Sequence, residues 1–209
     1  MDKIVYFFRH GESTANAEGK CGGQLDSPLT ALGREQAGAV APLIADICFD
    51  RVYCSDLTRA KQTAAIALPR ATPLYLPLLR ELSCGERAEG VPRTELIKIY
   101  GEEYPKAART RDYSFFGGES YADFAARVAA FKEMLEGEDA TSIAVFGHGG
   151  FIQEFFRQAM GVPQIIPQRI PLSNCSMSVF GVNGCVWSLC AYNFTANLCA
   201  NKKIRTEVV

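Results

Sequence analysis

The stretch Ile4-Val5-Tyr6-Phe7-Phe8-Arg9-His10-Gly11-Glu12 carries the strongest information about the fold. Its first five residues form a short, nearly continuous apolar run, which is typical of a strand buried in the middle of an α/β sheet. The run leads directly into a polar turn that contains an arginine, a histidine and a glycine. Open α/β sheets bind their ligands beyond the carboxyl ends of such strands, so this turn is a candidate functional site.

Strand-like and helix-like patterns alternate along the rest of the chain. Short apolar runs predict strands over residues 51–54, 74–79, 142–146, 176–182 and 185–192. Apolar residues at helical spacing predict helices over residues 29–45, 56–68, 121–135 and 151–160, and Thr30 is suited to cap the first of them. Residues 82–118 show a weaker pattern, with a short helical stretch at 94–100. They indicate an excursion over the sheet, where substrate contacts are often found.

The alternation of strands and helices favours an α/β fold. We expect a three-layer sandwich, in which a mainly parallel central sheet has helices on both faces. Asn183-Gly184 separates the last two strand-like runs and is a strong hairpin signal, so we expect a C-terminal antiparallel hairpin. A length of 209 residues lies in the range of one large domain, and we therefore expect a single domain over residues 1–209.

Charge and hydropathy exclude several classes of partner. The net charge is only −1, so the chain lacks the basic footprint of a protein that binds nucleic acid or an anionic membrane. No apolar stretch is long enough to span a membrane, and the apolar run near the N-terminus is too short for a signal peptide. We expect a cytoplasmic protein, either a monomer or a homodimer.

The eight cysteines include no Cys-x-x-Cys pair, which argues against a zinc ribbon or a redox motif. Several of them lie in apolar segments. We interpret them as small buried thiols in a reducing cytosol, with a disulfide framework as the alternative.

The chain has only two histidines, His10 and His148. Each follows a predicted buried strand and is flanked by glycine. A lone histidine is more often a structural or surface residue. Here both histidines of the chain lie at strand ends, which favours a role in chemistry. A histidine acts as a nucleophile when one ring nitrogen is held by a hydrogen bond and the other remains neutral and free.

Neighbouring residues support a phosphate site. Arg9 and Arg59 follow two different predicted strands, and their planar guanidinium groups match phosphate oxygens. Arginine at this place would bind the phosphate and stabilise the charge that develops during transfer. Glu81 is the first carboxylate after the third predicted strand and is the candidate acid for the leaving oxygen. The alternative interpretation of each arginine is a solvated surface residue. The alternative interpretation of Glu81 is a surface charge.

The order of the motifs resembles the histidine phosphatase superfamily, also called the phosphoglycerate mutase-like family. The resemblance runs nearly the full length of the chain. It rests on the blocks Arg9-His10-Gly11-Glu12-Ser13 with Asn16, Leu25-Asp26-Ser27-Pro28-Leu29-Thr30 with Gly33 and Gln36-Ala37, Ser55-Asp56-Leu57 with Arg59-Ala60 and Gln62-Thr63-Ala64, Leu79-Arg80-Glu81, Gly117-Gly118-Glu119-Ser120, and Gly147-His148-Gly149-Gly150.

The resemblance implies a role for each matching residue. His10 would carry the phosphoryl group as phosphohistidine, and Arg9, Arg59 and His148 would complete the phosphate pocket. Asn16 would donate a hydrogen bond to a phosphate oxygen. Glu81 would be the proton donor and later the base that activates water. No metal and no cofactor is expected.

Two segments depart from the family pattern. Many relatives have an aromatic-Gln-Gly-aromatic segment where this chain has Cys21-Gly22-Gly23-Gln24, so Gly22 and Gly23 would offer only backbone contacts to the substrate. The usual Phe-Gly-x-Trp-Glu-Gly after the acid is replaced by residues 84–90. Glu86 and Glu89, which lie in this altered segment, are therefore alternative acids.

The sequence thus predicts a phosphomonoester hydrolase of the phosphatase branch. Its substrate would be a small phosphorylated metabolite, such as a sugar phosphate or a nucleoside or ribazole phosphate. One alternative is a cofactor-dependent phosphoglycerate mutase, but the Arg-His-Tyr-Gly typical of mutases is missing after Glu81. The other alternative is a non-enzymatic module that binds a phosphorylated ligand or a protein.

Overall fold

The computed structural model describes residues 3–164 and 170–196. Its strands are β1 (Lys3–Arg9), β2 (Arg51–Cys54), β3 (Leu74–Tyr75), β4 (Ser142–Gly147), β5 (Met177–Asn183) and β6 (Val186–Phe194). They form one sheet in the order β3-β2-β4-β1-β5-β6. The first four strands in this order are parallel, while β5 pairs antiparallel with both β1 and β6. The predicted mainly parallel sheet and the C-terminal hairpin are confirmed.

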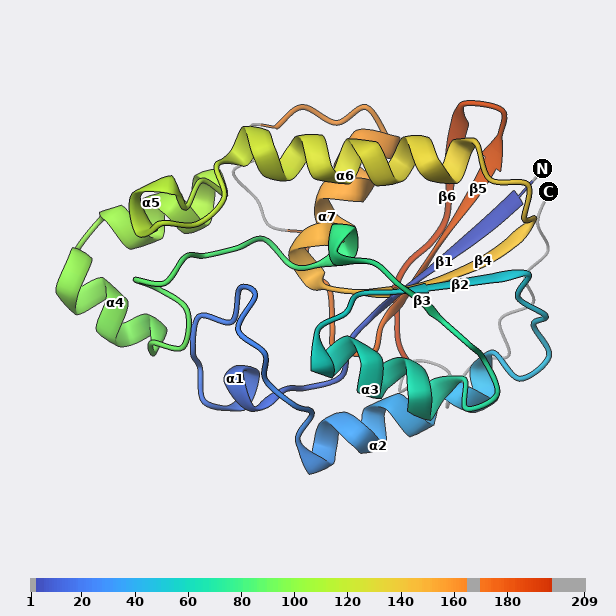
Figure 1. Ribbon diagram of the computed structural model, residues 1–209, viewed down its shortest axis with the longest axis horizontal. Helices are drawn as coiled ribbons and strands as arrows, with labels where there is room; N and C mark the ends of the chain where they lie inside the picture. Colours follow the sequence, from blue (N-terminus) through green and yellow to red (C-terminus); the bar gives the residue numbers. More distant parts are fainter. Residues whose placement is uncertain (1–2, 165–169, 197–209) are drawn as a thin grey trace.

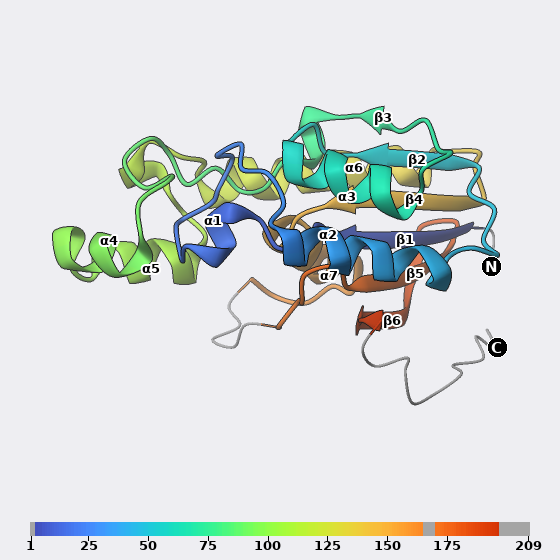
Figure 2. The ribbon, with the colours of Figure 1, turned by 90° about the horizontal axis from the view of Figure 1, so that it is seen from below.

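Helices cover both faces of this sheet. The described helices are α1 (Thr14–Ala17), α2 (Ala31–Val40), α3 (Thr58–Ala67), α4 (Arg93–Tyr100), α5 (Glu103–Thr110), α6 (Tyr121–Glu136) and α7 (Gly149–Ala159). Figure 1 shows α6 and α7 along one side of the sheet and α2 and α3 along the other, and Figure 2 shows the same layers from below. The three-layer sandwich is therefore confirmed.

Alternating side chains on each strand build two separate cores. On β1, Val5 and Phe7 point to the α6–α7 side, whereas Phe8 packs with residues of α2 and α3. On β4, Val145 and Phe146 divide between the two cores in the same way. Side chains of a strand alternate between the faces of the sheet, so a run that is apolar at every position is what a sheet covered on both faces requires.

Two predicted elements are shorter than expected, and in both cases a proline is the cause. The strand expected over 74–79 is limited to Leu74–Tyr75, and a 3-10 turn, Pro77–Leu79, follows it. Proline has no N–H for the strand ladder. The helix expected over 29–45 ends as α-helix at Val40, because Pro42 lies in a 3-10 turn. Thr30 caps this helix as predicted, since its hydroxyl accepts from the N–H of Gly33.

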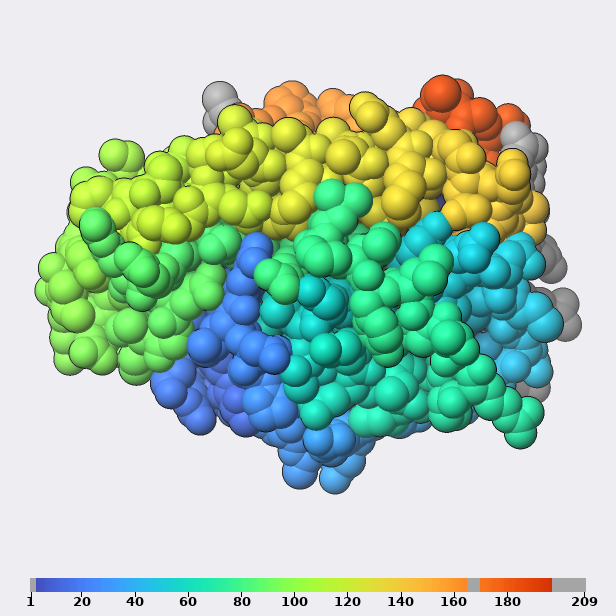
Figure 3. Space-filling view, viewed as in Figure 1, coloured from blue at the N-terminus to red at the C-terminus, as the bar shows by residue number. Residues whose placement is uncertain are grey.

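The excursion over residues 82–118, which lies between β3 and α6 in the sequence, is found at the carboxyl end of the parallel strands. It contains α4 and α5, which Figure 1 shows beyond the left end of the sheet, where β1 and β4 end. In Figure 3 this green segment forms one end of the molecule and lies beside the blue segment that follows β1. The excursion therefore lies next to the residues that follow β1 and β4, which include both histidines. In the described part of the chain, no helix is long and apolar enough to cross a membrane.

Candidate active site

The register of β1 and β4 brings the two histidines together. Arg9 of β1 is paired with Gly147 of β4, and His10 donates from its backbone N–H to the Gly147 carbonyl, at 3.0 Å. His10 and His148 are the next residues of the two parallel strands, and their ring centroids are 5.2 Å apart. Both side chains are buried. The two predicted site histidines therefore meet at one edge of the sheet.

The ring of His10 is held in one tautomer. Its Nδ1 lies 2.6 Å from the carbonyl oxygen of Gly11, and because a carbonyl only accepts, Nδ1 carries the proton. The lone pair is then on Nε2. Burial lowers the pKa of His10 well below its usual range, and the guanidinium groups of Arg59 and Arg9 lower it further. His10 is thus a neutral imidazole at pH 7, which is the form that a nucleophile needs.

The turn after His10 is fixed by close contacts. The N–H of Gly11 donates to the Thr63 hydroxyl at 3.0 Å. A Cβ added at Gly11 would lie 2.4 Å from the carbonyl oxygen of Gly33, and one added at Gly33 would lie 2.0 Å from that of Glu12. Only glycine fits at either position, because α2 begins in direct contact with this backbone. The position of His10 therefore depends on α2 and α3 as well as on β1.

His148 is held by a different partner. Its Nε2 forms a hydrogen bond of 2.8 Å with the Ser55 hydroxyl, which follows β2. Among the described residues, its buried Nδ1 has no hydrogen-bond partner. Burial lowers the pKa of His148 well below its usual range, and Arg59, His10 and Arg9 add to this effect. A polar ring atom that is buried without a partner is suited to bind an oxyanion.

Arg59 is anchored by the loop that precedes α2. Its guanidinium group donates to the carbonyl oxygens of Leu25 and Gly23, each at 2.7 Å. Asp26 in turn accepts from the N–H and the hydroxyl of Thr58, at 2.7 and 2.8 Å, which attaches this loop to the start of α3. Burial lowers the pKa of Arg59, although the nearby carboxylates of Glu81 and Asp26 partly offset the effect.

Arg9 extends from the end of β1 beside the helix that follows His148. One of its terminal nitrogens donates to the carbonyl oxygen of Leu172. Its Nε lies 3.3 Å from the place that a Cβ of Gly149 would occupy, and this buried nitrogen has no partner in the described part of the chain. Burial lowers the pKa of Arg9, and the charge of Glu81 acts in the opposite direction. Arg9, Arg59 and Glu81 therefore influence one another electrostatically around the two histidines.

Glu81 lies at the junction between this buried group and an open cavity. One carboxylate oxygen accepts from the N–H of Leu82 and the other from the N–H of Gly150, both at 2.9 Å. Gly150 follows His148 by two residues, so this second hydrogen bond places the carboxylate close to β4. Glu81 is half-buried and lines the cavity. This is the position expected of an acid that meets a leaving group.

The two alternative acids occupy other environments. Glu86 is exposed and does not line the cavity. Glu89 accepts hydrogen bonds at 2.9 Å from the N–H groups of both Gln24 and Cys84. The Glu89 carboxylate thus joins the two segments that depart from the family pattern. Its hydrogen bonds give it a structural task, whereas Glu81 faces the cavity.

Three further predicted residues lie in the segment between β1 and α2, Asn16 in α1 and Gly22 and Gly23 in the loop that follows it. Asn16 uses its carbonyl oxygen to accept from the N–H of Ser13, at 3.2 Å, which leaves its amide N–H groups as donors. Gly22 and Gly23 line the cavity, and Gly23 has a positive φ of 45°. A Cβ on Gly23 would lie 2.3 Å from a carboxylate oxygen of Glu89. This segment therefore presents its backbone to the cavity.

Sequence reasoning missed the residues that hold the site residues in place. The most prominent is Arg127 of α6, which donates to the carbonyl oxygens of Leu78, Arg80 and Glu81 at 2.9, 2.7 and 3.2 Å. Arg127 also forms two hydrogen bonds of 2.8 Å with the carboxylate of Glu119. It thereby fixes the backbone that carries Glu81. An arginine on the polar side of a helix gives no sign of such a distant partner.

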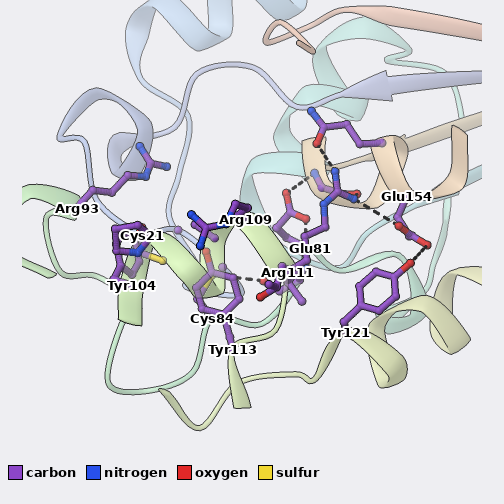
Figure 4. Close-up of a pocket in the computed structure, with 18 of the residues that line it drawn as sticks. Cys21, Glu81, Cys84, Arg93, Tyr104, Arg109, Arg111, Tyr113, Tyr121 and Glu154 are labelled. Atoms are coloured by element: carbon purple, nitrogen blue, oxygen red, sulfur yellow. Dashed lines mark hydrogen bonds and ion pairs between the residues drawn. The ribbon is translucent and has the colours of Figure 1, made fainter. Parts of the chain in front are cut away.

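An open cavity of about 740 Å³ lies against Glu81, Gly22, Gly23 and Gly150. Other lining residues belong to α4, α5, α6 and α7, and Figure 4 shows Arg93, Tyr104, Tyr121 and Glu154 among them. Cys21 and Cys84, from the two altered segments, both line it and are buried. The seven cysteines in the described residues are free thiols, of which Cys48, Cys185 and Cys190 are exposed. The expectation of buried thiols thus holds for four of these seven.

The family model of the histidine phosphatase superfamily (branch 1) matches residues 5–195. The chain belongs to this superfamily. A relative from Escherichia fergusonii named "Probable phosphoglycerate mutase GpmB" is 34% identical over 182 residues, which cover 83% of this chain and 82% of the relative. The corresponding protein of Enterobacter sp. (strain 638) is 32% identical over 177 residues, with the same coverage.

Solved structures of similar proteins share the fold of this histidine phosphatase. The α-ribazole phosphatase from Shigella flexneri superposes with a TM-score of 0.81 at 28% identity, covering 91% of this chain and 96% of that one. A mycobacterial glucosyl-3-phosphoglycerate phosphatase, determined with VO3, superposes with a TM-score of 0.80 at 26% identity and covers 92% of this chain and all of the other. The family assignment agrees with the resemblance found in the motifs and supports phosphatase chemistry.

Proposed function

We propose that this protein hydrolyses the phosphomonoester of a small metabolite and carries the phosphoryl group on His10. One observation carries the proposal: a neutral, buried histidine of fixed tautomer lies beside a second buried histidine and two arginines, with a carboxylate at the mouth of the site. Each group matches a need of phosphoryl transfer, which depends on a positioned nucleophile and on positive groups around the phosphorus.

In the first step, Nε2 of His10 attacks phosphorus and forms an N–P bond while the P–O bond to the substrate breaks. Arg9 and Arg59 bind the phosphate oxygens, and the amide of Asn16 and the backbone at Gly22 and Gly23 add hydrogen bonds. The leaving oxygen takes a proton from Glu81 in its acid form. The products are phosphohistidine, the free alcohol and the Glu81 carboxylate.

In the second step, water replaces the alcohol. The Glu81 carboxylate takes one proton from the water, whose oxygen attacks phosphorus, and the N–P bond breaks. Inorganic phosphate leaves, and His10 is again neutral. His148 lies opposite His10 and contributes a hydrogen bond from its ring to the phosphate. A bound dianion favours the protonated ring, so substrate binding would raise the low pKa of His148.

The first test measures the release of phosphate from a panel of phosphomonoesters between pH 5 and 8. The second stops the reaction during turnover without acid and measures the phosphoenzyme that has formed. We expect a phosphoenzyme that is labile in acid and stable in alkali, and we expect none with His10→Ala. Names of the solved relatives make ribazole phosphates and phosphoglycerate derivatives sensible members of the panel. A complete lack of phosphate release across the panel would count against the proposal.

A mutase is the second candidate, because relatives 32–34% identical carry a mutase name. Both reactions share the phosphohistidine, but a mutase must return the phosphoryl group to its substrate before water does. Incubation with 3-phosphoglycerate separates the two. We expect phosphate release or no reaction; formation of 2-phosphoglycerate without phosphate release would support the mutase instead. Tight phosphate-ester binding without any phosphoenzyme would support a non-enzymatic module.

A further inference from the structure

Two buried thiols lie together in the wall of the cavity beside Glu81. Cys21 belongs to the segment that follows α1, and Cys84 belongs to the loop that follows Glu81. Both side chains are buried, and both line the cavity. Figure 4 shows Cys21 next to Tyr104 and Cys84 next to Tyr113. The proposed phosphoryl transfer uses neither thiol, so the pair is available for other chemistry.

Backbone hydrogen bonds hold the two cysteine segments side by side. The carbonyl oxygen of Cys21 accepts from the N–H of Gly90 at 2.9 Å. One carboxylate oxygen of Glu89 accepts from the N–H of Gln24 and from that of Cys84, each at 2.9 Å. Both segments therefore belong to one hydrogen-bonded unit, and the fold itself brings the two thiols within reach of each other.

The thiols of Cys21 and Cys84 are hydrogen-bonded to each other. This contact lowers the pKa of Cys21, and the Tyr104 hydroxyl and the charge of Arg93 lower it further, against the effect of burial. The same contact raises the pKa of Cys84, and burial raises it too. The thiolate is the reactive form of cysteine, so Cys21 is the nucleophile of the pair.

The other cysteines of the described residues lack this setting. Of the seven thiols there, Cys21 and Cys84 are the two that line the cavity. Cys54 is packed in the core between the sheet and the helices α2 and α3, where burial raises its pKa to about 12. A structural buried thiol of this kind is inert. Reactivity towards a small molecule in the cavity therefore belongs to Cys21 and Cys84.

From this arrangement we propose that Cys21 and Cys84 form a redox site, where a small hydroperoxide reversibly converts the two thiols into a disulfide. The Cys21 thiolate attacks one peroxide oxygen, the O–O bond breaks, and an alcohol (water, from hydrogen peroxide) leaves with the proton that Cys21 has lost. Cys21 is then a sulfenic acid. The Cys84 sulfur attacks the Cys21 sulfur, the S–O bond breaks, and water leaves with the proton of Cys84. The two thiols together lose two electrons, and the peroxide gains them.

The disulfide affects the phosphate site through the same segments, and this step rests on the proposed function. A bond of about 2.05 Å between the sulfurs is much shorter than a hydrogen bond between two thiols, so its formation draws the two segments together. Gly23 lies two residues after Cys21, and its carbonyl oxygen accepts from Arg59 at 2.7 Å. Gln24 donates from its side chain to the carbonyl oxygen of Glu81 at 3.1 Å. Oxidation therefore displaces groups that hold Arg59 and Glu81, and it weakens the site.

Peptide mapping tests the disulfide without any turnover. The reduced protein is treated with hydrogen peroxide, its remaining thiols are alkylated in denaturant, and its tryptic peptides are analysed by mass spectrometry without reductant. Trypsin cleaves after lysine and arginine, so the disulfide links peptide 21–34, which contains Cys21, to peptide 81–87, which contains Cys84. We expect this pair to be the main disulfide product and dithiothreitol to separate it. Disulfides formed only by other cysteines, or no disulfide at all, would overturn the proposal.

Single variants test the order of the steps. In Cys84→Ala the oxidation of Cys21 should stop at the sulfenic acid, which dimedone labels, whereas dimedone should not label Cys84 in Cys21→Ala. Cys48→Ser is the matched control, because Cys48 is exposed and lies outside the cavity, and it should form the linked peptides like the unaltered protein. Labelling of Cys84 but not of Cys21 would overturn the assignment of the nucleophile. The peptide map of the unaltered protein needs no variant, so a variant that fails to fold leaves the proposal testable.

Phosphate binding and turnover measure the consequence for the site. Calorimetry should show that inorganic phosphate binds about fivefold more weakly after oxidation, as expected when a contact to a charged group is weakened. The kcat/KM for an alkyl phosphate should fall about tenfold, because a small displacement of the acid slows proton transfer. Both losses should disappear on reduction with dithiothreitol, and both should be absent in Cys21→Ala.

The outcomes separate this inference from the proposed function. Linked peptides with unchanged phosphate affinity overturn the effect on the phosphate site. Turnover that resists peroxide, in a protein that forms no linked peptides, contradicts the redox site but not the hydrolase. Linked peptides and weaker phosphate binding, in a protein that hydrolyses no phosphomonoester before oxidation, support the redox site and contradict the hydrolase.

Discussion

At the scale of single residues, the proposed mechanism makes His10 the nucleophile. His10→Ala removes the side chain that forms the phosphoenzyme in this mechanism, so phosphate release should fall by several powers of ten. The loop contacts of Gly11 with Thr63 and Gly33 do not involve the imidazole. We therefore expect the variant to unfold cooperatively and to bind inorganic phosphate. Substantial remaining turnover would rule out His10 as the nucleophile.

The identity of the acid is a second question at this scale. Glu81→Gln should lower kcat/KM by about 10²- to 10⁴-fold for alkyl phosphates, whose leaving oxygen needs a proton. The loss should be much smaller with p-nitrophenyl phosphate, because its leaving group departs without one. Comparison of the two substrates in the same variant is the measurement.

Glu86 and Glu89 provide the controls for this assignment. Glu86→Gln changes an exposed residue outside the cavity and should have no effect on either substrate. Glu89→Gln weakens the acceptor for the backbone N–H groups of Gln24 and Cys84, so its main effect should be a lower melting temperature. A leaving-group dependence that appears in Glu86→Gln or Glu89→Gln, and not in Glu81→Gln, would reassign the acid.

At the scale of elements, helix α6 positions the backbone that carries Glu81. Arg127→Met removes the hydrogen bonds to the carbonyl oxygens of Leu78, Arg80 and Glu81 and leaves Glu119 without its arginine. We expect kcat to fall about tenfold or more, because a misplaced acid slows proton transfer, while KM changes little. Steady-state kinetics with an alkyl phosphate measures both. A rise in KM with an unchanged kcat would argue for a role in substrate binding instead.

The elements that sequence predicted well are those whose pattern is local. β1 and β4 are apolar at consecutive positions, which by itself predicts buried strands. Thr30 directly precedes α2 and can cap it, which by itself predicts the start of a helix. β3 and the end of α2 were predicted too long because Pro42 and Pro77 outweigh the apolar pattern. Helix α5 was missed, since its sequence is polar and includes Pro105. The hydrogen bonds that Arg127 and Ser55 form could not be predicted either, because their partners are distant in the sequence.

The part of the candidate site that lies at the ends of predicted strands could also be predicted from the sequence. His10, His148, Arg9 and Arg59 follow strands that share one sheet edge, so the topology alone brings them together. The different environments of Glu81, Glu86 and Glu89 could not be predicted, because the altered segment at 84–90 gives no register.

At the scale of the whole molecule, the two buried histidines make folding sensitive to acid. Both have a pKa well below the usual value near 6.5 in the folded state. As pH falls below about 6.5, the unfolded chain binds protons that the folded chain excludes, so stability is complete above that pH and decreases below it. Each histidine contributes at most about 1.4 kcal/mol per pH unit.

Chemical denaturation between pH 7 and 5.5 checks this expectation. The chain has only two histidines, so His10→Asn should remove about half of the decrease in unfolding free energy that the unaltered protein shows. The window lies above the range in which most carboxylates titrate, which keeps their contribution small. A stability that stays constant down to pH 5.5 would mean that the histidines are not held neutral by the fold.

The pairing of Arg9 with Gly147 has a consequence for how such enzymes can be redesigned. Neighbouring strands in any sheet are about 4.8 Å apart, and the two imidazoles, which extend from adjacent strands, are 5.2 Å apart. The gap between the two rings, which the proposed mechanism assigns to the phosphate, is therefore set by the strand spacing of the sheet and not by the loops. We therefore expect changes within residues 82–118 that alter the substrate cavity to leave the spacing of the two rings unchanged.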